Sequence, residues 1–173
     1  LNDTKTDNVV LGIASQDVMI RKASLPAMPD KEVAQALEFE LPDILNISPE
    51  DLPNITYSYE ILSRTSNDIH LLVVSCLRSL IEPYLEVVRS VGLVPQVIDI
   101  AAFALPRITQ SDESCCYVDL GANQTTIYTE INGRFAVYRI LPFGGQLIDD
   151  GIAKAFGVDE LEAQALKHKH DLD

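Results

Sequence analysis

The sequence predicts a mixed α/β fold of the α+β kind, built from two successive series of elements. Short apolar segments rich in β-branched or alternating residues, which are typical of strands, are interleaved with segments whose apolar residues recur at helical spacing. A polar, acidic stretch at residues 109–114 separates the two series. The chain has 173 residues, of which 47% are hydrophobic, so it can bury a core.

The first series opens with two predicted strands, at Val9–Ala14 and Asp17–Ala23. The prolines of Leu25–Pro29 then predict a rigid connector. We expect Asp30 to cap a helix whose apolar positions recur at helical spacing. These positions are Val33, Ala36, Leu37, Leu41 and Ile44. Pro42 should end or bend this helix near Leu41, because proline cannot donate the helical hydrogen bond.

Two further strands follow. Tyr57, Tyr59 and Ile61 alternate with polar residues, and Ile69–Cys76 is apolar on both faces, as a central strand would be. A second helix carries one apolar stripe and stops at Gly92. The stripe consists of Ile81, Leu85, Val88 and Val91. A strand at Val94–Ile98 and a short helix at Ala101–Ile108 complete the series.

The second series starts with a strand at Cys116–Leu120. Thr125–Ile131 and Arg134–Ile140 form a predicted hairpin, closed by Asn132-Gly133, a dipeptide that tolerates two positive φ values. A helix that ends at Gly157 follows, and Asp159 with Glu162 three residues later resembles the capping box of a last helix.

Charge and cysteine content limit the function classes. Acidic residues number 26 and basic residues 13, so the net charge of −13 repels nucleic acid and anionic lipid. The apolar runs fall short of the roughly 20 residues that a membrane-spanning helix needs. Cys115 and Cys116 are adjacent, which rarely allows a disulfide. We therefore expect reduced thiols, as in a cytoplasm.

One stretch, Val118–Gly145, carries residues suited to phosphate binding. Gly121 lacks a Cβ atom, so its backbone can approach a bulky anion, and the amides that follow can point at phosphate oxygens. Those amides belong to Ala122, Asn123, Gln124 and Thr125, and the threonine hydroxyl could donate a further bond. Asp119 is suited to hold a hydrated Mg²⁺ that bridges to phosphates. Gly144-Gly145 precedes a helix, whose N-terminus favours anions. The alternative is a hairpin whose glycines only form turns.

Five segments of the chain resemble the PilM family, the actin-like proteins of the type IV pilus inner-membrane assembly platform, which are similar to the cell-division protein FtsA. These segments are Ile20–Met28, Glu32–Glu40, Gly92–Leu105, Val118–Thr126 and Arg139–Ala153. The resemblance runs from about Val9 to Lys167 and implies a partial actin-like ATPase fold. Residues 1–108 would be the remainder of the first lobe, with an inserted strand–helix–strand–strand subdomain at about 15–76. Residues 109–114 would be a hinge, and 115–173 the start of the second lobe.

The resemblance also implies ligands. The family's second phosphate motif falls on Asp119, Gly121 and Thr125, and its glycine pair on Gly144 and Gly145, which implies ATP and Mg²⁺ in the intact protein. Where the family usually has a threonine, this sequence reads Gln146–Asp149. The first phosphate loop and the adenosine motif of such ATPases are missing from this sequence, and we find no candidate catalytic base. We therefore expect these residues to bind ATP weakly or not at all, with little or no hydrolysis.

By the same resemblance, the protein is expected to be a cytoplasmic scaffold, peripheral at the inner membrane through its partners. It would bind the N-terminal cytoplasmic tail of a PilN-like membrane protein in a groove beside the small subdomain, and self-association is a further expectation. Two alternatives stay open: an FtsA-like cell-division filament protein, and an active Mg²⁺-dependent ATPase.

Overall fold

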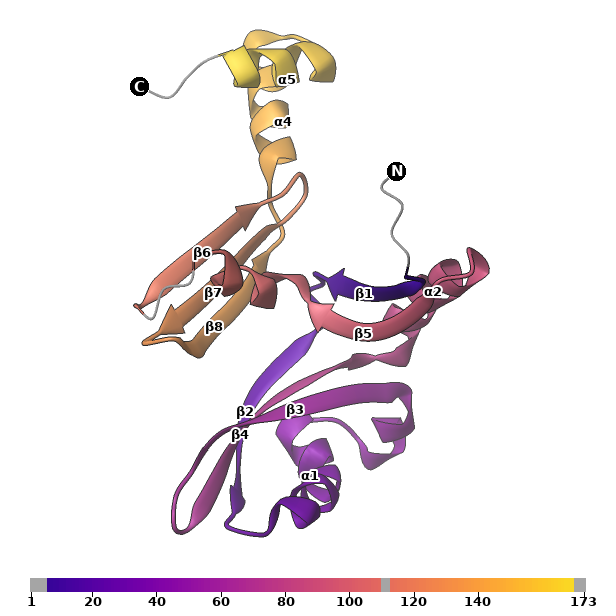
Figure 1. The fold of residues 1–173 in the computed structure, drawn as a ribbon. Coiled ribbons are helices and arrows are strands. Elements are labelled where there is room, and N and C mark those ends of the chain that lie inside the picture. Colours follow the sequence, from indigo (N-terminus) through magenta and orange to yellow (C-terminus); the bar gives the residue numbers. More distant parts are fainter. Residues whose placement is uncertain (1–5, 110–112, 170–173) are drawn as a thin grey trace. The chain divides into compact units, whose positions relative to one another are not determined.

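The computed structural model describes residues 6–109 and 113–169. The chain divides into two compact units (Figure 1). Unit 1 comprises residues 1–11 and 15–98, and unit 2 comprises residues 12–14 and 99–173. Within the described ranges, no helix is both long and apolar enough to cross a bilayer.

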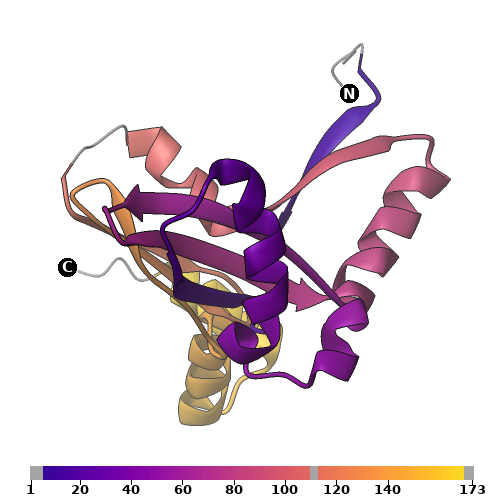
Figure 2. The same ribbon diagram turned by 90° about the horizontal axis from the view of Figure 1, so that it is seen from below.

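Unit 1 contains the predicted strand–helix–strand–strand subdomain. Its antiparallel sheet has the order β2-β4-β3. The strands are β2 (Met19–Pro26), β3 (Ile55–Arg64) and β4 (Asp68–Leu77). The helix α1 (Asp30–Leu45) packs against one face of the sheet, as Figures 1 and 2 show, and a 3-10 turn at Pro49–Asn54 (η1) leads into β3. β2 extends to Pro26, so it includes the first two residues of the predicted connector.

The core of unit 1 lies between α1 and the sheet. Helical spacing brings one stripe of α1 onto the sheet, where it meets alternate residues of β4, the central strand. The buried side chains are Leu25, Val33, Leu37, Leu41, Leu45, Ile55, Ile69, Leu71 and Val73. This arrangement explains the apolar residues on one face of β4, and Leu72 and Cys76 are buried on its other face.

The N-terminus of α1 differs from the prediction that Asp30 caps it, and that prediction is wrong. The helix begins at Asp30 itself, and Pro29 occupies the capping position without a side-chain hydrogen bond. The Asp30 carboxylate instead forms an ion pair with the Arg64 guanidinium at the end of β3. The Asp30 carboxylate, which the local sequence pattern predicted to bind the helix backbone, therefore binds the distant Arg64 side chain instead.

At the C-terminus of α1, Pro42 does not end the helix, which was one of the two outcomes predicted for it. The helix continues through Pro42 and ends at Leu45, not near Leu41. Leu45 is only 3% exposed, so its burial against the sheet offsets the hydrogen bond that Pro42 cannot donate. Asn46, at φ 55°, then ends the helix in the left-handed conformation.

Five further elements precede β6 in the chain. α2 (Arg78–Ser90) ends before Gly92, which has the positive φ of 78° that glycine tolerates. β1 (Asn8–Ile13) and β5 (Val94–Ile100) form a two-stranded sheet. The short helix predicted over 101–108 is two pieces, a 3-10 turn at Ala101–Ala104 (η2) and α3 (Pro106–Thr109).

Unit 2 is built on the predicted hairpin. β6 (Cys115–Leu120), β7 (Thr125–Ile131) and β8 (Arg134–Leu141) form an antiparallel sheet in that order. Asn132 and Gly133 have φ values of 52° and 68°, which confirms the predicted turn. An aromatic cluster packs on one face, with Phe103 of η2 next to Tyr128, Phe135 and Tyr138.

Two helices follow the sheet, as predicted. α4 (Gly145–Phe156) ends at Gly157, whose φ is 67°. The Asp159 carboxylate accepts a hydrogen bond of 2.9 Å from the Glu162 amide, so Asp159 caps α5 (Glu160–Lys169). This bond confirms the half of the capping box that the aspartate supplies.

The three cysteines are free thiols. Cys76 is buried in β4, and burial raises its pKa. Cys115 is half-buried and Cys116 exposed, because successive residues of β6 point to opposite faces of the sheet.

The change from unit 1 to unit 2 falls between Ile98 and Asp99, so residues 99–108 pack with unit 2. The sequence had placed the boundary at residues 109–114. Of that stretch, residues 110–112 lie outside the described ranges, and the hinge stays a prediction.

Leu37→Ala is expected to lower the free energy of unfolding by about 3 kcal/mol, because it opens a cavity in a well-packed core. The Leu37 side chain is fully buried between α1 and the sheet. Urea denaturation measures the loss. The control is Phe39→Ala on the same helix, where the side chain is 89% exposed, and we expect a change within about 0.5 kcal/mol. Equal losses in the two variants would contradict this placement of the core.

Candidate functional site

The candidate site is the turn between β6 and β7, residues 121–124, which we call the glycine turn. Asp119 lies one residue before the end of β6, opposite Thr126 of β7, and its side chain is exposed. The Gly121 amide donates a hydrogen bond of 3.0 Å to the Gln124 carbonyl, which closes the turn. A Cβ atom at Gly121 would lie 3.0 Å from that carbonyl oxygen, so the tight turn favours glycine.

The glycine turn is bonded directly to the N-terminus of α4. The Gly145 amide donates to the Gly121 carbonyl at 2.9 Å, and the Gln146 amide donates to the Ala122 carbonyl at 2.8 Å. Two of the amides at the start of the helix therefore bind backbone oxygens of this chain. Gly121 and Gly145, two of the residues predicted to bind phosphate, therefore lie close together, but the Gly145 and Gln146 amides are not left open for an anion.

Gly144 is required by the closeness of two backbones. A Cβ atom there would lie 2.3 Å from the Gly121 oxygen and 2.5 Å from the Ala122 oxygen, far inside contact distance. The residue is also buried. The glycine pair thus allows the backbone of the turn to pack directly against the backbone at the start of α4. This role is closer to the alternative in which the glycines serve the local structure and not a ligand.

Thr125 has a structural role that the sequence did not reveal. Its side chain is 4% exposed, and the hydroxyl donates a hydrogen bond of 2.8 Å to the Phe143 carbonyl. In this structure the proton of the hydroxyl is committed to the segment before Gly144, and its donation to phosphate stays a prediction. Thr125 therefore fixes the path of the chain into α4.

Three predicted site residues face solvent. Asp119, Ala122 and Asn123 are exposed, and the amides of Ala122 and Asn123 bind no acceptor among the described residues. No group of three or more His, Cys, Asp or Glu side chains in the described ranges could hold a metal ion by itself. A hydrated Mg²⁺ needs only one or two carboxylates when phosphates complete its shell. One exposed carboxylate beside two free amides fits such a shared ion.

An ion pair behind the glycine turn was missed by the sequence analysis. Lys167 of α5 places its Nζ 2.7 Å from Asp149 Oδ2 on α4, and it donates to the Gly145 carbonyl at 3.3 Å. The Asp149 side chain is 5% exposed, and its Oδ1 has no hydrogen-bond partner among the described residues. Two residues 18 positions apart on different helices carry no local signal of pairing. The pair ties α5 to the residue that contacts the glycine turn.

Comparisons with known proteins agree with this architecture. A family model described as type IV pilus assembly protein PilM matches residues 2–173. A solved PilM–PilN type IV pilus biogenesis complex contains a chain with a TM-score of 0.76 and 24% identity, covering 95% of this chain and 51% of that chain. The cytoplasmic domain of EpsL, an inner-membrane component of the type II secretion system of Vibrio cholerae, matches with a TM-score of 0.50 and 17% identity. That match covers 88% of this chain and 57% of the EpsL chain.

This chain thus spans about half the length of the solved relatives it matches. Likenesses at these identities show the fold and not the activity. Together with the family match they confirm the predicted fold class, a partial actin-like ATPase fold with an inserted strand–helix–strand–strand subdomain.

Proposed function

The chain belongs to the PilM family of type IV pilus assembly proteins, and we propose that it acts as a cytoplasmic scaffold of a type IV pilus inner-membrane platform. The observation that carries the proposal is the family match over residues 2–173. The structural likeness to a chain of a PilM–PilN complex, over 95% of this chain, supports it. This chain spans about half of that relative. The partner and the ligand of the whole protein are therefore part of what we propose.

The proposed partner is a PilN-like membrane protein, bound through its N-terminal cytoplasmic tail. Attachment to the membrane is then indirect and peripheral. The net charge of −13 supports this choice, since it disfavours direct contact with anionic lipid or nucleic acid.

The test is a calorimetric titration of this protein with a synthetic peptide copied from the cytoplasmic tail of a PilN-type protein. We expect saturable binding with a Kd on the order of micromolar, about −8 kcal/mol. A peptide of the same composition in scrambled order is the control. If the native and scrambled peptides bind alike, or neither binds, the proposed partner is wrong.

We also propose that ATP with Mg²⁺ contacts the glycine turn where a complete fold surrounds it. Asp119 would hold the hydrated ion, and the free amides of Ala122 and Asn123 would face the phosphates. The ion would supply charge neutralisation. Thr125, Gly144 and Gly145 would shape the turn through their backbone contacts, without touching the nucleotide.

For this chain alone we expect an ATP Kd weaker than about 1 mM and no phosphate release, because a nucleotide held from one side loses most of its contacts. Titration with ATP in the presence of Mg²⁺ checks this result. Any Mg²⁺-dependent binding that remains should disappear in Asp119→Asn and persist in Asp150→Asn, an exposed control on α4. Micromolar binding, or equal loss in both variants, would show that the nucleotide site has been assigned wrongly.

A further inference from the structure

Two amides of the glycine turn, those of Ala122 and Asn123, each share a peptide unit with a carbonyl that α4 binds. A peptide unit is planar and trans, so its N–H points opposite to its C=O. The Gly121 carbonyl accepts from the Gly145 amide at 2.9 Å, which directs the Ala122 amide away from α4. The Ala122 carbonyl accepts from the Gln146 amide at 2.8 Å, which directs the Asn123 amide in the same manner. The start of α4 therefore sets the direction of both open amides.

One of these two bonds continues back to a charged side chain. The Gly145 carbonyl belongs to the same peptide unit as the Gln146 amide, and it accepts a hydrogen bond of 3.3 Å from Lys167 Nζ. The Lys167 ammonium, the Gly145–Gln146 peptide and the Ala122–Asn123 peptide thus form one continuous series of hydrogen bonds, which we call the lysine relay. Its last member is the Asn123 amide, which is exposed.

The Ala122 amide ends a second series, which contains backbone groups only. The Leu147 amide donates to the Gly144 carbonyl at 3.1 Å, and the Gly145 amide of that same peptide unit donates to the Gly121 carbonyl. The two open amides are neighbours in the chain, but only one of them is connected to a charged donor. They therefore provide an internal comparison.

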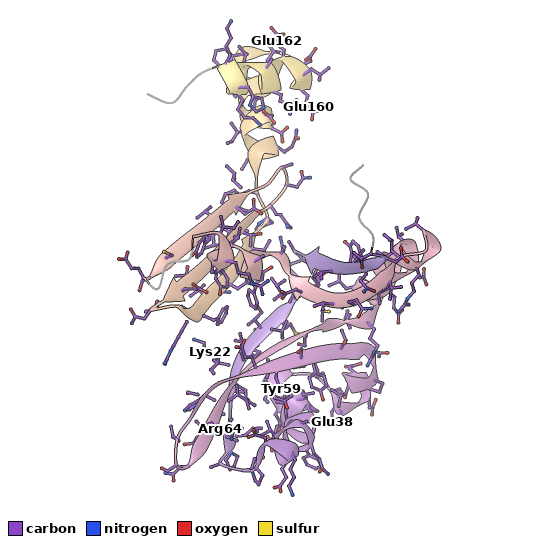
Figure 3. All side chains as sticks on the ribbon, in the orientation of Figure 1. Lys22, Glu38, Tyr59, Arg64, Glu160 and Glu162 are labelled. Carbon is purple, nitrogen blue, oxygen red and sulfur yellow. The ribbon has the colours of Figure 1, made fainter. Side chains whose placement is uncertain are left out.

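The lysine of the relay is fixed between α4 and α5. Asp149 Oδ2 on α4 lies 2.7 Å from Lys167 Nζ on α5. Glu160, labelled on α5 in Figure 3, accepts a hydrogen bond of 2.9 Å from the Gln146 side chain. α5 thus contacts the first turns of α4 at two places. Because the Asp149 carboxylate balances the ammonium charge, the pair acts on the turn through hydrogen-bond polarisation more than through net charge.

We infer that Lys167 is a positioning residue of the nucleotide site, which directs and polarises the Asn123 amide toward a phosphate oxygen through the lysine relay. The inference rests on the proposed function for its ligand. Hydrogen bonds in series strengthen one another by roughly 10–30% per bond, and a charged donor makes the strongest bond in such a series. The N-terminus of α4, whose amides are occupied, then acts on the anion through the glycine turn and not by direct contact.

Amide NMR of the ligand-free protein tests the relay. In the unsubstituted protein, scalar couplings across the two hydrogen bonds from α4 to the glycine turn should be detected. Lys167→Met should move the Asn123 amide nitrogen resonance upfield at least about twice as far as that of Ala122, because only the Asn123 amide loses a charged donor. Lys167→Arg keeps a charged donor and should restore most of that shift. Lys154→Met, which removes an exposed lysine of α4, should move neither resonance.

Equal shifts at Asn123 and Ala122 in Lys167→Met, or no recovery in Lys167→Arg, would mean that Lys167 only stabilises the fold, against the inference. If Lys167→Met does not fold, the couplings in the unsubstituted protein decide. Their presence supports the relay, and their absence overturns it.

Titration of the same amides with ATP and Mg²⁺ separates the relay from the proposed ligand. Within the glycine turn the Asn123 amide should move most, and Lys167→Met should need about twofold more ATP for the same shift. If ATP moves the Asn123 amide equally in the unsubstituted and Lys167→Met proteins, the nucleotide proposal stands and the inference is overturned. If ATP moves no amide of the glycine turn, the nucleotide proposal fails, and the inference fails with it.

Discussion

Gly144→Ala is expected to lower the free energy of unfolding of unit 2 by about 3 kcal/mol or more, because the added methyl group has no space. Its Cβ would lie 2.3 Å from the Gly121 oxygen and 2.5 Å from the Ala122 oxygen. Both are backbone atoms, so no side-chain rotation can relieve the clash. The bonds from Gly145 and Gln146 to the glycine turn should then break.

Thermal unfolding measures the total loss, and hydrogen exchange at Gly145 and Gln146 reports the local change. Gly151→Ala is the matched control, because Gly151 lies inside α4 and an added Cβ would meet nothing within 4 Å. It should stabilise α4 by about 1 kcal/mol, the helix preference of alanine over glycine. Opposite signs for the two substitutions are the expected result. If Gly144→Ala is neutral, the close contact between the turn and α4 is wrong.

Lys167→Met is expected to destabilise unit 2 by about 3 kcal/mol, since removing one partner of a buried ion pair leaves the other charge uncompensated. The Lys167 side chain is 23% exposed, whereas that of Asp149 is only 5% exposed, so the cost comes mainly from the stranded carboxylate. The loss should also loosen α5, because Lys167 contacts both Asp149 and the Gly145 carbonyl. Urea denaturation followed by circular dichroism measures it.

The double variant Asp149→Leu/Lys167→Met separates burial from pairing. Replacing both charges by apolar groups should recover most of the stability, as it often does for buried pairs. Lys154→Met on α4 is the control for loss of an exposed lysine, and it should change stability by less than about 0.5 kcal/mol. If the double variant is as unstable as Lys167→Met alone, the carboxylate is not the origin of the cost.

Short-range sequence patterns predicted the turns and helix ends that depend only on neighbouring residues. The Asn132-Gly133 turn, the end of α4 at Gly157 and the cap at Asp159 follow from φ preferences and short-range hydrogen bonds, and all three are found. The two ends of α1 could not be predicted in this way. Arg64, 34 residues away, takes the Asp30 carboxylate, and burial of Leu45 carries the helix past Pro42. In both places a tertiary contact outweighs a local preference.

The candidate site was likewise predictable from the sequence only in part. The sequence singled out the residues near Asp119 and those near Gly144 as candidates, and the structure brings the two groups close together. The sequence could not show whether these glycines make room for a ligand or for another backbone segment, because both uses require a residue without a Cβ atom. For Thr125 and Gly145 the hydrogen bonds favour the structural use, since both donors are occupied within the chain.

The unequal exposure of the three thiols gives the protein a natural attachment point for a reporter dye. Cys116 is exposed and Cys115 only half-exposed, while Cys76 is buried, and burial raises its pKa. A maleimide fluorophore supplied in slight excess should therefore couple first to Cys116, without any engineered substitution. Because Cys116 belongs to unit 2, the dye would report on changes in that unit.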